Sequence, residues 1–170
     1  MLKALLAAIC AFGLTFLTIA PAIAVTPAAE KAFVDAYKKA IETSDKKTLQ
    51  GFLYTVGANP MALDFYKEMV TMEAGSTVTQ IALTDLTAED KQQIATQKGA
   101  DGKPSKSNIP IVKKLTFKTE TKSANGSSSG TSSVFVGEID GKLMIAVPAK
   151  WVSFGIQLFV ETSFLQGASG

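Results

Sequence analysis

The side chains that could carry chemistry in this sequence are carboxylates, lysines, tyrosines and hydroxyls. Asp64 and Glu68 are spaced one helical turn apart, and two carboxylates at that spacing could share a proton or a cation. They could equally flank Lys67 on a solvated helix face, which is the commoner role of charges at this spacing. No short stretch groups these residues as an active site would. The sequence therefore favours a role other than catalysis and leaves enzyme activity open.

Several catalytic and metal-binding classes are excluded by composition. The chain has no His and no Arg, its 17 basic residues are all lysine, and its one cysteine is Cys10. Because Cys10 lies in a leader that we expect to be removed, residues 25–170 have neither His nor Cys, which excludes the Ser-His-Asp and Cys-His mechanisms and ordinary zinc, copper or haem ligation. Neither a calcium-binding loop nor a glycine-rich phosphate loop is present. We therefore expect no metal and no cofactor.

The distribution of charged residues indicates whether the protein binds nucleic acid. The formal net charge is +2, and the lysine pairs at 38–39, 46–47 and 113–114 are separated by acidic or apolar residues. A nucleic-acid interface concentrates basic residues on one face and generally uses arginine for bidentate contacts. The sequence indicates a solvated surface instead, and we expect no nucleic-acid partner.

The N-terminus has the three parts of a secretory signal peptide. Lys3 precedes an apolar stretch over residues 4–20, and Ala22 and Ala24 supply small residues at −3 and −1 of a cleavage site. Residues 1–24 are thus predicted to be removed, taking Cys10 with them, and residues 25–170 to be exported as one periplasmic or secreted domain. An uncleaved membrane anchor is the alternative, because the uncharged stretch is longer than the about 20 residues that span a bilayer.

The elements that must position any site begin with helices. A 3.6-residue apolar stripe predicts a helix over residues 29–42, Asp45 or Ser44 caps a short second helix, and Asn59 with Pro60 starts a third that ends at Gly75. Thr87 opens a capping box for a fourth short helix. These assignments place the helices mostly before residue 76.

Strands dominate the rest. Residues 76–83 and 111–122 have strand patterns, and from 114 onward the second has one apolar and one polar face. The segment ANGSSSG at 124–130 is predicted to be a flexible turn. Asp140-Gly141 is a two-residue hairpin signal between 134–139 and 142–147. From about residue 149 the chain continues as an apolar tail, whose period of two over 151–165 favours a strand over a helix.

Two stretches resemble the cystatin-like superfamily typified by nuclear transport factor two and ketosteroid isomerase. Residues 36–53 (AYKKAIETSDKKTLQGFL) look like the first helix, break and second helix of that group, and residues 138–146 (EIDGKLMIA) are similar to its late hairpin. The resemblance covers most of residues 28–148. It implies an α+β fold with N-terminal helices packed on a curved antiparallel, cone-like sheet and a concave pocket, but no particular reaction.

A pocket of that kind would be lined by aromatic side chains. Tyr37, Tyr66, Phe117 and Trp151 are candidate ligand-binding residues, although each could simply pack in the core. The leading hypothesis is an exported binding or accessory domain that holds a small apolar ligand or a protein partner in the cone. One alternative is an isomerase- or lyase-like enzyme using a carboxylate and a tyrosine. Another is an envelope-associated structural module whose tail pairs with another chain, and a homodimer also stays open.

Overall fold

The computed structural model describes residues 25–98, 102–123 and 126–150. The predicted leader with Cys10, and the apolar tail with Trp151, lie outside the described residues. The elements run in the order α1 (Pro27–Glu42), α2 (Lys46–Gly51), α3 (Pro60–Thr71), β1 (Thr77–Asp85), α4 (Ala88–Thr96), β2 (Ile111–Ser123), β3 (Gly126–Ile139) and β4 (Lys142–Ile145).

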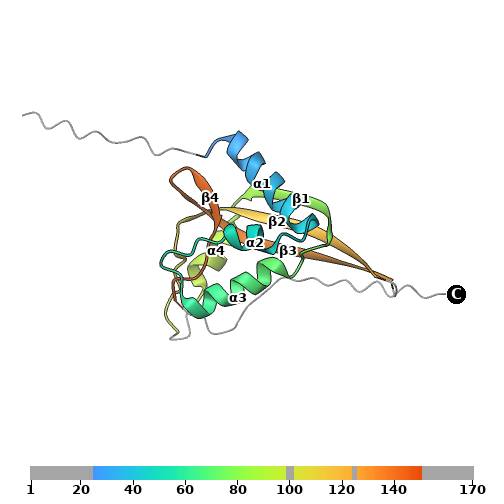
Figure 1. Cartoon of the computed structure of the whole chain (residues 1–170). Coiled ribbons are helices and arrows are strands. Elements are labelled where there is room, and N and C mark those ends of the chain that lie inside the picture. Colours follow the sequence, from blue (N-terminus) through green and yellow to red (C-terminus); the bar gives the residue numbers. More distant parts are fainter. Residues whose placement is uncertain (1–24, 99–101, 124–125, 151–170) are drawn as a thin grey trace, which may run out of the picture.

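The four strands form one antiparallel sheet in the order β1-β2-β3-β4. Figure 1 shows the helices α1, α2 and α3 beside this curved, unclosed sheet, with the long β2–β3 hairpin extending past them. The helix α1 packs against β1 and β4, and α2 packs against both α1 and α3. The predicted α+β class, with N-terminal helices on a curved antiparallel sheet, is confirmed.

The predicted helix starts are also confirmed by their caps. The side chain of Asp45 accepts the backbone N–H of Thr48 at 3.0 Å, and that of Asn59 accepts the N–H of Ala62 at 3.2 Å. Each bond satisfies a backbone donor that has no partner within the helix. Asn59 fixes the start of α3, and α3 in turn borders the candidate site.

The core lies between α1, α2 and one face of the sheet. Its fully buried large side chains are Tyr37, Ile41, Leu49, Leu115, Val136, Ile145 and Val147. The inner face of β2 carries Leu115, Phe117 and Thr119, all buried, as the alternation of that strand predicted. Phe52 joins the helices by edge-to-face contacts with Phe33 and Tyr37, both with centroids 5.2 Å apart.

The turn predicted over residues 124–130 is wrong for residues 126–130, and residues 124–125 lie outside the described part of the chain. The strand β3 begins at Gly126, which pairs with Ser123, and each residue from Ser127 to Gly130 has a partner on β2. Serine and glycine have low strand propensity, but the ladder to a long, well-patterned β2 supplies the backbone partners that decide the conformation. The strand β3 therefore has 14 residues, whereas β4 has 4.

The unequal strand lengths leave part of β3 without a partner on one side. The strand β4 pairs only with Val136–Ile139, and the N–H of Ala146 adds one bond to the carbonyl of Phe135. The outer edge of β4 is itself closed, because Ile145 exchanges backbone hydrogen bonds with Phe52 and Tyr54. Among the described residues, nothing pairs with residues 127–134 on the edge opposite β2.

Across residues 25–98, 102–123 and 126–150, no helix combines the length and the apolar character needed to cross a bilayer.

Candidate functional site

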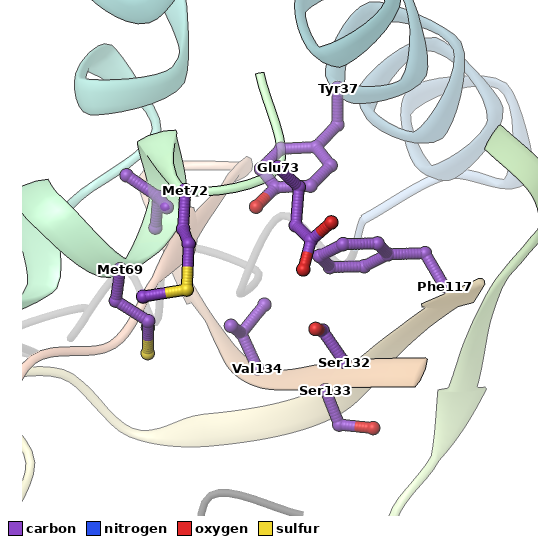
Figure 2. Close-up of a pocket in the computed structure, with 9 residues that line it drawn as sticks. Tyr37, Met69, Met72, Glu73, Phe117, Ser132, Ser133 and Val134 are labelled. Atoms are coloured by element: carbon purple, nitrogen blue, oxygen red, sulfur yellow. The ribbon is translucent and has the colours of Figure 1, made fainter. Parts of the chain in front are cut away.

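A hollow lies between the C-terminal end of α3 and the inner face of the sheet. Figure 2 shows it walled by one side chain from α1, several from the end of α3 and the turn that follows, and others from β2 and β3. Its lining residues are Tyr37, Met69, Val70, Met72, Glu73, Phe117, Ser132, Ser133 and Val134. The site therefore draws on four elements that are far apart in the sequence.

The hollow is small. Its volume is about 20 Å³, against the about 10–15 Å³ that one water molecule needs on this measure. A molecule of metabolite size does not fit unless the side chains at its mouth move. Two of those side chains are the unbranched Met69 and Met72, a residue type that adapts its shape readily.

Glu73 is the charged group of the hollow. It lies in the turn after α3, and that turn is fixed where the N–H of Gly75 donates to the carbonyl of Ile41 at 2.7 Å. Thr119 Oγ1 donates a 2.7 Å hydrogen bond to Glu73 Oε2 from the inner face of β2. No ion pair within the described part of the chain involves Glu73. Its half-buried carboxylate is thus held by a neutral donor.

Tyr37 also lines the hollow, next to Glu73 (Figure 2). Its side chain is 1% exposed, and its ring centroid lies 5.5 Å from that of Phe117. Burial raises the pKa of the Tyr37 hydroxyl, and the negative charge of Glu73 raises it further. The phenol therefore stays neutral throughout the physiological range and can donate a proton to a hydrogen bond.

The structure places the four residues predicted to bind a ligand in different surroundings. Tyr37 and Phe117 meet at the hollow. Tyr66 does not line it; this side chain packs half-buried against the core, edge-to-face with Phe65 at 6.1 Å. Trp151 lies outside the described residues. Tyr37 and Phe117 are also core residues, so each packs in the core and lines the hollow at the same time.

Sequence reasoning missed Glu73 and Thr119. A signal for both was present, since each is a polar residue on an otherwise apolar face. Glu73 follows Tyr66 and Val70 at helical spacing, and Thr119 follows Leu115 and Phe117 at strand spacing. A polar side chain on a buried face requires a partner, and here the two are partners of each other.

The mouth of the hollow is apolar and exposed. Met72, which lines the hollow, is 71% exposed. Ser132 and Val134 line the sheet side of the mouth, on the part of β3 that has no second partner among the described residues. In Figure 2 the hydroxyl of Ser132 points toward Glu73, whereas that of Ser133 points away. We call this surface the α3–β3 groove: Met69 and Met72 on one side, Ser132, Ser133 and Val134 on the other.

The other charged clusters hold elements together. Lys114 Nζ lies 2.8 Å from Asp90 Oδ1, and Asp90 also closes the capping box of α4 with Thr87. Lys113 bridges Glu30 of α1 and Asp85 of β1. No group of three metal-ligating side chains occurs within the described ranges. The charges of Lys113, Lys114 and Asp90 are therefore paired within the protein.

Asp64 and Glu68 are both exposed, and Asp64 pairs with Lys67 at 3.0 Å. The pair therefore lies on the solvated face of α3, away from the hollow, which is the arrangement considered as the commoner one for this spacing.

No family model, no curated protein and no solved structure matches this chain. The resemblance to the cystatin-like superfamily therefore stays a prediction, and functional arguments must come from the groove itself.

Proposed function

We propose that the protein is an exported binding domain that takes an extended polypeptide segment of a protein partner into the α3–β3 groove. The observation that carries this proposal is the open edge of β3 beside an exposed Met72. A strand edge offers backbone donors and acceptors to an incoming segment, and pockets beside it select alternate side chains. Export is proposed from the signal-peptide pattern of residues 1–24.

The groove supports a particular kind of segment. One face of an added strand would meet Met69, Met72 and Val134, so its side chains should be apolar. The other face would lie beside the exposed Ser133, so its side chains should be polar. An acidic residue on the inner face is disfavoured, because Glu73 already carries a negative charge there.

A small apolar ligand, the other form of this hypothesis, has less support. The hollow of about 20 Å³ would have to widen, with Met69 and Met72 turning outward, before such a ligand could enter. A bound polypeptide needs no such opening, because its main chain can stay at the edge of β3 while only side chains approach the hollow.

A peptide-display selection tests the proposal. The bait is the full chain carrying Phe154→Asp and Ile156→Asp, so that the apolar tail does not compete with the displayed peptides. We expect enriched peptides to alternate apolar and polar residues and to lose about tenfold or more in affinity when Met72→Asp is added, as for a buried apolar contact replaced by a charge. Val56→Asp is the matched control, since Val56 is 67% exposed but does not line the groove. Peptides that bind the Met72→Asp and Val56→Asp forms equally well would contradict the proposal.

A second candidate function is favoured by the convergence of Glu73 and Tyr37 on the hollow. A carboxylate can accept a proton from carbon next to a carbonyl group and return it, while a neutral phenol donates a hydrogen bond to the enolate oxygen. Proton exchange of a small enolisable ketone in D2O, followed by NMR, tests this. The enzyme hypothesis requires exchange above the buffer rate that is lost in Glu73→Gln; exchange unchanged in that variant excludes it.

A further inference from the structure

We propose that residues 152–160 of this chain form a fifth strand on the open edge of β3, antiparallel to it, and occupy the α3–β3 groove in the free protein. The inference rests on the proposed function, because it concerns the same groove. It names the occupant that any external segment must displace.

The backbone of β3 is oriented for such a partner. The N–H of Ala146 donates to the carbonyl of Phe135, so the polar backbone groups of Phe135 face the β4 side. In an antiparallel strand successive residues alternate between the two sides. The N–H and C=O groups of Ser133, Thr131 and Ser129 therefore also face the open edge. These are the groups that an added strand would bind.

The described chain ends close to this edge, after residues 147–149 have left β3 and bonded to residues 106–108. The strand β4 runs antiparallel to β3, and the chain continues along it as far as Ala146, opposite Phe135. The described chain ends at Lys150, four residues later. Four residues span at most about 14 Å, so Lys150 lies within that distance of Ala146, whose hydrogen-bond partner Phe135 borders the open edge.

The end of the described chain also lies at the head of α3. The N–H of Asn59 donates to the carbonyl of Pro148 at 3.0 Å, which places the exit of the tail beside the first turn of that helix. At 1.5 Å per residue, α3 carries the surface from Asn59 to Met72 over about 20 Å. Six extended residues cover that length, since a strand rises about 3.3 Å per residue. The exposed Met61 and Met72 lie at the two ends of this path.

The residue pattern of the tail fits the two faces of the groove. One set of alternating positions is wholly apolar and uncharged: Val152, Phe154, Ile156, Leu158 and Val160. The other set, Ser153, Gly155, Gln157 and Phe159, carries no charge, and the acidic Glu161 that follows the strand continues on this outer face, away from Glu73. Burial of the apolar set against Met69, Met72 and Val134 would drive the docking.

Docking within one chain is favoured over pairing between chains. A short tether of a few residues holds a segment near its site at an effective concentration of the order of millimolar. At micromolar protein concentration, the segment of the same chain therefore outcompetes that of another molecule. In an envelope-associated module, by contrast, the tail would pair with a different chain.

Disulfide trapping tests the inference on the full chain in a Cys10→Ser background. Ser133→Cys is combined in turn with cysteine at Ser153, Gly155 and Gln157, which share its outer face, and at Phe154 and Ile156, which do not. Because cysteines whose Cβ atoms point apart cannot be bridged, we expect one outer-face pair to oxidise at least about tenfold faster than either inner-face pair. The product should be a monomer, identified by mass spectrometry of non-reduced peptides.

Two outcomes overturn the inference: equal oxidation rates for all pairs, or disulfides that join only different chains. Adding an aspartate to the apolar set, at Leu158, should slow the fast pair, whereas Phe159→Asp on the outer face should not. Failure here leaves the proposed function intact if the display selection still yields groove-binding peptides. Failure of both experiments removes the groove as a binding site.

Discussion

Thr119 Oγ1 donates a 2.7 Å hydrogen bond to Glu73 Oε2 across the hollow between the sheet and the end of α3. The bond joins the inner face of β2 to the turn that precedes β1. Among the described residues that line the hollow, Glu73 is the only charged one, and this bond holds its carboxylate against the sheet.

Replacing Thr119 by valine tests the strength of this tie. Thr119→Val keeps the shape but removes the donor, and Glu73 loses its partner in a half-buried setting. We expect a loss of about 1.5–3 kcal/mol in the free energy of unfolding, as for a hydrogen bond to a charged group. Urea unfolding measures it. Thr116→Val is the control, since its bond to Ser133 lies on the exposed outer face and should matter by less than about 0.5 kcal/mol. Equal effects of the two variants would contradict the role given to Thr119.

The acid dependence of stability should reside partly in Asp90. Burial acts to raise the pKa of this carboxyl, but hydrogen bonds from Lys114 and Thr87 outweigh burial and hold the pKa below its ordinary value. The charged form is thus favoured by folding. Its contribution is present above the unfolded pKa of about 3.9 and is lost as the pH falls through the lower folded value.

In Asp90→Asn this contribution is absent, so the urea midpoint should fall less steeply below about pH 4 than in the unmodified protein. The measurement is a series of unfolding curves between neutral and acid pH. Parallel pH profiles for the two proteins would show that Asp90 is not a source of the acid sensitivity.

Gly137 should tolerate no side chain. A Cβ at this position would lie 2.5 Å from the carbonyl oxygen of Pro110 and would also strike Ile109. We expect Gly137→Ala to cost about 1–3 kcal/mol, as overpacking of a filled interior does. Gly51→Ala is the matched control, because nothing lies within 4 Å of the added methyl group on α2 and alanine stabilises a helix by up to about 1 kcal/mol relative to glycine. A neutral Gly137→Ala would contradict the close packing of Ile109 and Pro110 against β3.

Local signals in the sequence predicted most of the framework. Asn59-Pro60 gave the start of α3 because a cap and a fixed φ act within a few residues. Asp140-Gly141 gave the β3–β4 hairpin, and both residues have the positive φ, 49° and 75°, that this turn requires. Neither signal depends on distant parts of the chain.

The site itself depends on distant parts of the chain and was only half predicted. Tyr37 and Phe117 were named as aromatic residues, but their meeting with Glu73 follows from the way α1, β2 and the turn after α3 pack together. The start of β3 was missed for the same reason: its serines have no intrinsic preference for a strand and acquire one from β2. The open edge became visible only once the strand lengths could be compared.

The most direct test of the account is amide hydrogen exchange at Thr131 and Ser133, read residue by residue by NMR. Ser132 and Val134 are internal controls, since their backbone groups face β2. In the full chain we predict slow exchange at all four residues, with Thr131 and Ser133 alone becoming fast when Phe154→Asp and Ile156→Asp are introduced. Fast exchange at Thr131 and Ser133 in the unmodified chain, unchanged when a selected peptide is added, would contradict the claim that this edge accepts a strand.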